Sequence, residues 1–382
     1  MMARLGDVGK VITGNTPKTS DMQNYASKDI CFVKPSDIFD GTVSYLDNSE
    51  FYISEYARTK VRVLPPKSVL VTCIGIIGKV AINNVECAFN QQINAIIPDK
   101  NKCLTEYLAY AIQNKQEEMQ DIANAPVVPI LNKTQFSNID INLPSLNEQT
   151  EIVEKLNAVS ELIALRKEQL AKLDQLVKSR FIEMFGKETE FDKWPCCTIG
   201  DVADVCVGVV IKPTQYYTDK GIPAFRSLNI GEMRVKDSDW VYFTEEGHQN
   251  NQKSVVHKND VLVVRSGAPG TACVATEKYD GYNAVDIIIA HPDNSKVNSI
   301  FLAAFTNMPH GMNQIRERTG GAAQQHFNVG GYKAMRLILP SIESQNQFAA
   351  FVEQTDKSKF DLKQSLDKLE LLKKSLMQEY FG

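Results

Sequence analysis

The sequence lacks long apolar runs. Its 382 residues are 43% hydrophobic and 23% charged, which is ordinary for a globular protein. No run approaches the ~18 to 20 consecutive apolar residues that cross a bilayer. The first ten residues are mixed in character and contain no apolar core of a signal peptide. We therefore expect a cytoplasmic protein that makes no contact with a membrane.

Paired cysteine motifs are also missing. The 8 cysteines are scattered apart from the adjacent Cys196 and Cys197, and no Cys-x-x-Cys occurs, which argues against a zinc ribbon. We expect free thiols in a reducing compartment, most of them buried as small hydrophobic residues. The net charge of −4 argues against an indiscriminate nucleic-acid binder. It does not exclude basic residues gathered on one face, or a subunit of a larger assembly.

The signatures of common enzymes are absent as well. The Pro-Pro pair at 65–66 follows Leu64, so the Asn/Asp-Pro-Pro-aromatic motif of adenine methyltransferases does not occur. Neither a Gly-x-Gly-x-x-Gly segment nor a Walker loop is found. All 5 histidines fall in the second half of the chain, which excludes a catalytic pair built from equivalent histidines of two halves. We expect no catalysis by this chain alone, and no metal or cofactor of its own.

What the sequence does contain is a long internal repeat. Leu-Gly-Asp-Val at 5–8 returns as Ile-Gly-Asp-Val at 199–202, and Leu-Pro-Ser at 143–145 returns at 339–341. Phe-Gly at 185–186 returns as the last two residues. In each copy a strand-like run (68–72 and 260–264) is followed by two glycines, Gly75 and Gly78 or Gly267 and Gly270, which we interpret as turn residues. Helical spacing follows over 104–122 and 300–318.

Each copy ends in a segment with the spacing of a long helix. Ser145 and Glu148 form a capping box after a proline, and apolar residues then recur in steps of three and four, which is coiled-coil spacing. Arg166 in the first helix, and Thr355 and Lys359 in the second, interrupt the apolar seam. A helix over 146–185 would be about 60 Å long, and it needs a partner in water. We expect the two helices to pair with each other rather than lie on their own domains.

The sequence thus predicts an α+β protein with two similar β-rich domains and two long helices. The expected boundaries are 1–143 for the first domain, 144–186 for the first helix, 187–339 for the second domain and 340–382 for the second helix. Two similar but non-identical modules on a stiff support suit the recognition of two places on an extended partner.

The chain resembles the specificity subunit of type I restriction-modification systems over essentially its whole length. The resemblance is carried by Leu-Pro-Ser-Leu-Asn-Glu-Gln-Thr-Glu-Ile at 143–152 and by the shorter Leu-Pro-Ser-Ile-Glu-Ser-Gln at 339–345. Asp-Val-Leu-Val at 260–263 is similar to the family's Gly-Asp-Val-Leu strand, with Asn259 in place of Gly. Gly-Gly-Ala-Ala-Gln-Gln at 320–325 is similar to its Gly/Gln-rich segment. The first copy has Ala-Pro-Val-Val-Pro at 125–129 instead, and Ser344 replaces the family's Glu in the second copy.

The resemblance implies two target-recognition domains separated by two long helices that pack antiparallel. Each domain would read one half of a split, asymmetric target in double-stranded DNA. The helices would set the gap between the halves and dock two modification subunits, which methylate adenine with S-adenosylmethionine. Restriction subunits, with ATP and Mg²⁺, would join to form the cleaving complex, so all cofactors would belong to partner subunits.

Polar residues near the predicted turns are the candidates for DNA contact, because Arg and Lys suit guanine edges and Asn and Gln suit adenine edges. Lys34 and Arg226 occupy matching places and begin matching loops. Each candidate has a simpler interpretation as a solvated loop residue or a backbone cap, and Trp194 and Trp240 are interpreted as core or interface anchors. The candidates are Thr16, Lys18, Lys34, Ser36 and Gln91 in the first copy, and Lys212, Arg226, Ser227, Asn229, Arg265, Gln324 and Gln325 in the second.

Two other functions remain open from sequence alone. One is a coiled-coil scaffold that binds proteins through both modules and never touches DNA. The other is an enzyme with a diverged site between the copies. Steep weakening of DNA association with salt would favour a DNA reader over a scaffold, since such a reader displaces counterions from phosphates.

Overall fold

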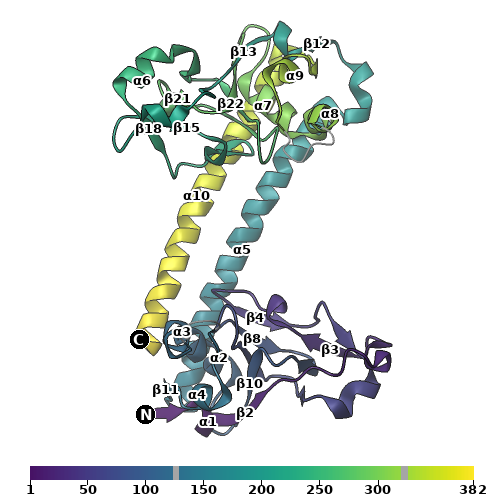
Figure 1. The fold of residues 1–382 in the computed structure, drawn as a ribbon, viewed down its shortest axis with the longest axis vertical. Helices are drawn as coiled ribbons and strands as arrows, with labels where there is room; N and C mark the ends of the chain where they lie inside the picture. The colour runs from purple at the N-terminus through teal and green to yellow at the C-terminus, as the bar shows by residue number, and fades with distance from the viewer. Residues whose placement is uncertain (124–128, 320–325) are drawn as a thin grey trace. The chain divides into compact units, whose positions relative to one another are not determined.

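The computed structural model describes residues 1–123, 129–319 and 326–382, and it divides into two compact units (Figure 1). Unit 1 comprises Met1–Lys167 and Ser365–Gly382, and unit 2 comprises Glu168–Gln364. Both long helices are therefore shared between the units and do not form units of their own. The glycine-rich segment at 320–325, with Gln324 and Gln325, and residues 125–128 of the alternative segment lie outside the described residues.

Unit 1 contains two packed sheets and a small strand pair. The larger sheet has the order β2-β10-β7-β8-β4, and the smaller one has the order β5-β3-β9-β6. The strands of the larger sheet are β2 (Gly9–Thr13), β4 (Val43–Leu46), β7 (Val69–Thr72), β8 (Val80–Asn83) and β10 (Ile93–Pro98). The others are β3 (Ile30–Val33), β5 (Tyr52–Ile53), β6 (Val63–Leu64), β9 (Cys87–Phe89), and the pair β1 (Met2–Arg4) with β11 (Asp140–Asn142).

The two faces of the larger sheet of unit 1 bury different partners, as the alternation of side chains along a strand requires. Val69 and Val71 of β7 pack with Tyr107 and Leu108 of the helices, whereas Leu70 packs with residues of the smaller sheet. The helices are α1 (Leu5–Val8), α2 (Thr105–Asn114), α3 (Gln116–Ile122) and α4 (Lys133–Ser137), with 3₁₀ helices at Met22–Tyr25, Pro35–Asp37 and Glu55–Lys60. The helical stretch predicted at 104–122 is thus two helices, broken at Lys115.

Unit 2 repeats this plan with different details. Its larger sheet has the order β13-β22-β19-β20 and its second sheet the order β14-β18-β15-β21. The strands are β12 (Cys196–Thr198), β13 (Ala203–Val207), β14 (Tyr217–Thr218), β15 (Ile222–Phe225), β16 (Ile230–Gly231), β17 (Arg234–Val235), β18 (Val241–Phe243), β19 (Val261–Val264), β20 (Ala272–Val274), β21 (Asn283–Ala284), β22 (Ile287–Pro292) and β23 (Arg336–Ile338). β12 pairs with β23 as β1 pairs with β11.

The helices of unit 2 are α6 (Glu245–Asn250), α7 (Ser299–Asn307), α8 (Pro309–Thr319) and α9 (Val329–Lys333), with 3₁₀ helices at Glu188–Lys193, Ile199–Asp201, Pro213–Tyr216, Ser227–Asn229, Gln252–Ser254 and Glu277–Tyr279. Three of them, α7, α8 and α9, match α2, α3 and α4 of unit 1 in order, whereas α6 lies where unit 1 has a 3₁₀ helix. The predicted stretch 300–318 is again two helices, because Pro309 cannot continue the first one. Trp194 packs half-buried on the main core and donates from Nε1 to the carbonyl oxygen of Phe185 (2.7 Å), as expected for an anchor.

The long helices are α5 (Leu146–Phe185) and α10 (Ile342–Phe381). The helix predicted at 146–185 is confirmed at both ends. The capping box is confirmed too: the Ser145 amide donates to Glu148 Oε2 (2.9 Å), and the Glu148 amide donates to Ser145 Oγ (3.4 Å). No helix among the described residues is both long and apolar enough to cross a membrane.

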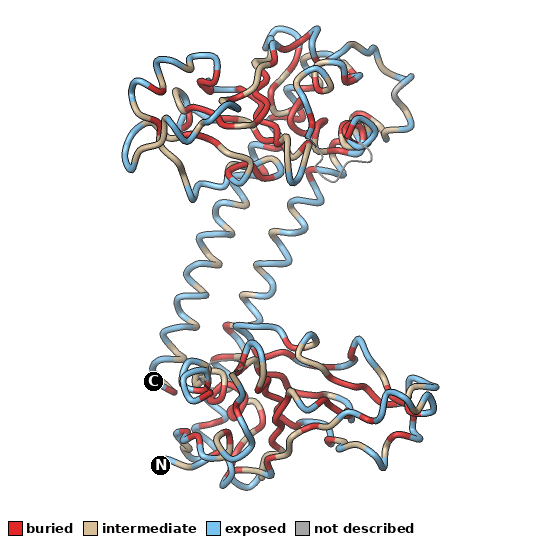
Figure 2. The backbone as a smooth tube through the Cα atoms, viewed as in Figure 1, coloured by how far each residue is buried: buried red, intermediate tan, exposed pale blue. Residues whose placement is uncertain are grey.

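α5 and α10 pair antiparallel within each unit. In unit 1, Lys167 forms an ion pair with Glu370 (2.9 Å), and Lys155 Nζ donates to the Tyr380 hydroxyl (3.3 Å). In unit 2, Lys359 pairs with Asp174 (2.8 Å), so a residue that interrupts the apolar seam finds a charged partner on the other helix. Figure 2 shows the buried residues of both helices concentrated near their ends, where the helices pack against the rest of a unit.

A buried glutamine fastens the first turn of each long helix. Gln149 Nε2 donates to the carbonyl oxygens of Lys102 (3.0 Å) and Pro144 (2.9 Å), and Gln149 Oε1 accepts from the Leu104 amide (2.9 Å). Gln345 repeats this set in unit 2 with Lys296, Pro340 and Asn298, at 3.3, 2.9 and 2.9 Å. Both glutamine side chains are fully buried. The two copies therefore share this buried Gln, although the residue before it differs (Glu148 and Ser344).

A buried phenylalanine fastens the last turn of each helix. Phe185 ends α5 and packs in unit 2 against the rings of Phe181, Phe301 and Phe348, at 5.1, 5.0 and 5.7 Å between centroids. Phe381 ends α10 and packs in unit 1 against Tyr107 at 5.2 Å. The core of each unit therefore packs against the beginning of one long helix and the end of the other.

Candidate nucleic-acid interface

In unit 1, four loops meet at one edge of the packed sheets. β3 and β9 are parallel, so the loops that follow them, 34–37 and 90–92, leave the same edge. β2 and β7 both run antiparallel to β10, so the loops after them, 14–18 and 73–79, lie beside the start of β10. Hydrogen bonds tie the loops together, including the Cys73 amide to the carbonyl oxygen of Gln92 (2.8 Å). We call these four loops the unit-1 loop edge.

The unit-1 loop edge brings two of the predicted residues into direct contact. The Thr16 hydroxyl donates to Gln91 Oε1 (2.6 Å), although the two residues belong to different loops. Both are exposed. The contact fixes the orientation of the Gln91 amide and leaves its NH₂ group facing solvent, without a partner among the described residues. An oriented, exposed amide is the group that reads adenine in the major groove.

The other candidates of unit 1 lie around this pair. Lys34 begins the 34–37 loop, with its amide donating to Asp37 Oδ2 (2.8 Å) and its Nζ 3.1 Å from the centroid of the Phe51 ring. The ring holds the ammonium by a cation–π contact, so the charge of Lys34 already interacts with a side chain of its own unit. Ser36 and Lys18 are exposed, and Lys18 sits in the 14–18 loop.

Sequence reasoning missed two residues of the unit-1 loop edge. Lys79 Nζ donates to the carbonyl oxygen of Pro35 (2.6 Å) and to that of Ile38, so its charge orders the 34–37 loop from the neighbouring turn. Ile76 lies in the 73–79 turn with 57% of its surface exposed. An exposed apolar side chain of this kind can contact a thymine methyl group. The sequence signal that could have identified Ile76 was its position between Gly75 and Gly78, which places it in a turn.

Unit 2 builds the equivalent edge from equivalent loops. β15 and β21 are parallel, and β13 and β19 flank β22. The loops 208–212, 226–229, 265–271 and 285–286 therefore meet, and we call them the unit-2 loop edge. The Gly208 amide donates to the carbonyl oxygen of Ile287 (2.9 Å), as that of Gly14 does to Ile93 (3.1 Å) in unit 1.

Arg265 holds the unit-2 loop edge together. Its Nη1 pairs with Asp286 Oδ1 (2.5 Å), and its Nε donates to the carbonyl oxygen of Phe327 (3.1 Å). Only 15% of its side chain is exposed. The guanidinium therefore ties three segments of unit 2 together, and in this geometry it positions the loops rather than presenting its charge outward. The corresponding place in unit 1 is occupied by Cys73.

The 226–229 loop of unit 2 uses its predicted residues mainly as caps. Asn229 is fully buried; its Oδ1 accepts from the Arg226 amide (2.9 Å), and its Nδ2 donates to the carbonyl oxygen of Ser238 (2.6 Å). Arg226 is half-buried and donates to the carbonyl oxygen of Asp239. Ser227 lines a cavity of about 820 Å³ within unit 2. Trp240 packs edge-on against Phe225 (4.9 Å between centroids), as expected for a core anchor.

Lys212 is the most accessible predicted cation of unit 2. It is exposed and adopts a left-handed conformation (φ 45°), which is uncommon outside glycine. The preceding Ile211 is 80% exposed, so the loop presents an apolar and a charged side chain in succession. Sequence reasoning selected Lys212 and missed Ile211.

The four repeated glycines occupy turns, as predicted. Gly75, Gly78, Gly267 and Gly270 all have positive φ, between 79° and 91°. At Gly270 a side chain would also meet the Ile315 side chain at 2.6 Å. Their role is to close the 73–79 and 265–271 loops.

Comparison with known proteins agrees with the duplicated plan. The family model of the type I restriction modification DNA specificity domain matches residues 1–175 and 192–373. The chain is 24% identical over 375 residues to the type I restriction enzyme MjaIX specificity subunit of Methanocaldococcus jannaschii, covering 92% of this chain and 85% of that one. It is 32% identical over 148 residues to the HindI specificity subunit of Haemophilus influenzae, covering 38% of this chain and 32% of that one.

Solved structures show the same fold. The type I restriction-modification S subunit from M. genitalium superposes with a TM-score of 0.59 at 13% identity, covering 100% of this chain and 96% of that one. A chain from a study of complex assembly and conformational transition of the type I restriction-modification system gives 0.61 at 18% identity, covering 100% and 97%.

Proposed function

The chain belongs to the type I restriction modification DNA specificity family, and from this premise we propose that each of its units reads one half of a split, asymmetric target in double-stranded DNA. The reading surfaces are the unit-1 and unit-2 loop edges. The chain chooses the site and performs no chemistry on it, which is the role of a specificity subunit.

The observation that carries this proposal is the contrast between a repeated frame and unlike loop edges. Gln149 and Gln345 make matching sets of hydrogen bonds in the two units. The loop edges differ: the unit-1 loop edge has a hydrogen bond between Thr16 and Gln91, whereas the unit-2 loop edge has an ion pair between Arg265 and Asp286. A frame of one kind with two different surfaces suits a target made of two different half-sequences.

The long helices would set the gap between the half-sequences. α5 and α10 each run unbroken for 40 residues and contribute to both units, and ion pairs such as that of Lys167 with Glu370 join the two helices. We propose that the exposed central turns of this pair dock two modification subunits. Those subunits would supply S-adenosylmethionine and methylate adenine, and restriction subunits with ATP and Mg²⁺ would complete a cleaving complex.

The test is a methylation assay with the full chain and its modification subunit. We expect adenine methylation at one bipartite motif, with unequal halves and a fixed gap, and no methylation by either protein alone. Binding of the complex should weaken steeply with salt, because phosphate contacts release counterions. Methylation that is independent of this chain, or a motif with only one specified half, would reject the proposal.

A further inference from the structure

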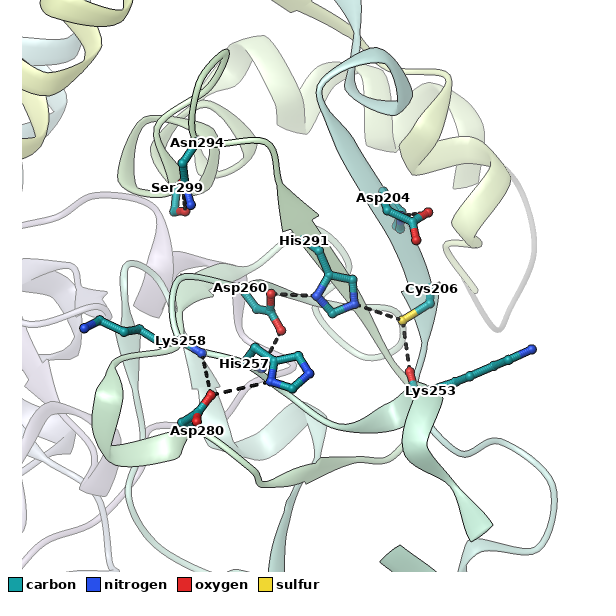
Figure 3. Close-up of polar contacts among 11 residues, drawn as sticks. Asp204, Cys206, Lys253, His257, Lys258, Asp260, Asp280, His291, Asn294 and Ser299 are labelled. Carbon is teal, nitrogen blue, oxygen red and sulfur yellow. Dashed lines mark hydrogen bonds and ion pairs between the residues drawn. The ribbon is translucent and has the colours of Figure 1, made fainter. Parts of the chain in front are cut away.

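A cysteine, a histidine and an aspartate form a linked set on one face of the larger sheet of unit 2 (Figure 3). Cys206 Sγ lies 3.6 Å from His291 Nε2, and His291 Nδ1 lies 2.7 Å from Asp260 Oδ1. β22 carries His291 between β13, which carries Cys206, and the start of β19, which follows Asp260. Strand pairing therefore fixes the order of the three groups.

The second oxygen of Asp260 is also held. Its Oδ2 accepts from the His257 amide (2.6 Å), and only 5% of the Asp260 side chain is exposed. The carboxylate is thus fixed by its own turn and orients the imidazole from one side. A nucleophile, a base and a third group that orients the base make the arrangement that activates cysteines in enzymes.

The charges around the cluster favour a protonated His291. The hydrogen bond to Asp260, followed by that to Cys206, raises the pKa of His291 to about 10. The His257 ring lies 6.1 Å from the His291 ring and faces Asp280. Asp204 pairs with Lys333 (3.5 Å). The Cys206 thiol donates a hydrogen bond to the carbonyl oxygen of Lys253 (3.2 Å), while the Lys253 side chain points away in Figure 3.

The cluster does not match a metal site or a hydrolase. No group of three or more His, Cys, Asp or Glu side chains among the described residues has an arrangement that could hold a metal. The two cavities described in unit 2 are lined by other residues. Cys206 is nevertheless partly exposed at the edge strand of its sheet, and 32% of the His291 side chain is exposed. The accessible reactant is therefore a small one.

We propose that Cys206 is a reactive thiol, activated by His291 and Asp260, and that it is a site of oxidation by peroxide. The sulfur of the Cys206 thiolate attacks one oxygen of hydrogen peroxide, an S–O bond forms and the O–O bond breaks. The leaving hydroxide takes the proton of the His291 imidazolium and departs as water. Sulfur is oxidised to the sulfenic acid, peroxide is reduced, and His291 is reprotonated from solvent. A thiolate beside a cation is the form that undergoes this reaction.

Unit 1 lacks the cluster at the same places of its sheet. The fourth residue of β2 is Ile12 where β13 has Cys206, and the fifth residue of β10 is Ile97 where β22 has His291. Ser68 precedes β7 where Asp260 precedes β19. Since the fold forms without the cluster in unit 1, these polar groups are not a requirement of the sheet.

The experiment measures alkylation of each cysteine of the full chain by iodoacetamide, with mass spectrometry, from pH 6.5 to 8. A free thiol should gain about 20-fold in rate over this range, since only the thiolate reacts. We expect the rate at Cys206 in the folded chain to change by less than about 3-fold, and the same cysteine in urea to follow the 20-fold rise. This comparison needs no substitution, so it holds whether or not a variant folds.

Substitutions then assign the cause. His291→Gln should slow alkylation of Cys206 at pH 6.5 by about 10-fold or more, and His326→Gln, in the same unit but outside the cluster, should leave it unchanged. Dimedone added after hydrogen peroxide should trap a sulfenic acid at Cys206 in the native chain and far less in His291→Gln. A 20-fold rise with pH in the folded chain, equal rates in the two histidine variants, or no dimedone adduct at a fast-alkylating Cys206 would each overturn the proposal.

Discussion

The unit-1 loop edge presents an exposed pair, Thr16 and Gln91, where the unit-2 loop edge contains the half-buried ion pair of Arg265 and Asp286. Both edges are closed by the same kind of backbone hydrogen bonds and by glycines with positive φ. The difference therefore lies in side chains and not in the route of the backbone. It teaches that one backbone plan can carry two different sets of loop side chains, which is what two unlike half-sequences would demand.

The largest effect should come from the aromatic anchors, and it should be unequal between the units. Phe185→Ala removes a ring packed among several others in unit 2 and should cost about 3–5 kcal/mol of unfolding free energy. Phe381→Ala, where one ring contact with Tyr107 is lost, should cost less. Hydrogen exchange of each unit measures both losses. Equal losses of unfolding free energy in the two units would show that the additional ring contacts of unit 2 do not stabilise it further.

The buried glutamines should behave alike. Gln149→Leu leaves the Leu104 amide and two carbonyl oxygens without partners, at about 1–3 kcal/mol for the buried amide alone, and Gln345→Leu should have a matching effect in unit 2. Gln175→Leu, on the exposed face of α5, serves as the control. Urea denaturation with a probe in each unit gives the comparison. A substitution that weakens both units equally would contradict separate anchoring.

Arg265→Gln should affect only the unit-2 loop edge. The variant leaves Asp286 without its cation and frees the 265–271 loop, so we expect a loss of about 1–3 kcal/mol in unit 2 and a relaxed preference at one half of the DNA target. Motif analysis of methylated DNA, beside local hydrogen exchange, checks both parts. If base preference relaxes in both halves of the DNA target, the two units do not read their halves independently.

The smallest effect concerns pH and belongs to unit 2 alone. The pKa of His291 is about 10 in the fold, mainly because of Asp260, and ~6.5 in an unfolded chain. The folded state thus holds the proton more tightly. The stabilisation is fully present below pH 6.5 and is lost as the pH rises toward 10. Unfolding of unit 2 in urea should become easier over this window, and His291→Gln should remove the trend. A free energy of unfolding of unit 2 that rises between pH 6.5 and 10 would contradict this prediction.

Local patterns in the sequence predicted the parts of the fold that depend on local spacing. The ends of α5, its capping box and the four turn glycines follow from periodicity and backbone preference at 145–185, 75–78 and 267–270. The break at Lys115 did not, because apolar spacing continues across it. Pro309, by contrast, was a visible stop signal that the prediction at 300–318 passed over.

The candidate site was harder to predict because its residues are defined by partners far along the chain. Lys34 and Arg226 were placed correctly as equivalent, since their loops have matching sequences. Arg265 was selected for its charge, but its environment depends on Asp286, which only the pairing of β19 with β22 brings near. Asn229 was chosen as a base reader and is a buried cap, and no pattern in its loop indicates that burial. The direct contacts of these residues with DNA stay predictions.

The central claim, that each unit reads its own half of the target, is tested most directly by the methylation motif of Gln91→Ala beside that of the unchanged chain, each assembled with the modification subunit. Gln91 lies on the unit-1 loop edge only, and loss of one good base contact should relax one position by about 1–3 kcal/mol. We predict a change confined to one half, with the other half and the gap unaltered. A motif altered in both halves, or in its gap, would contradict the account.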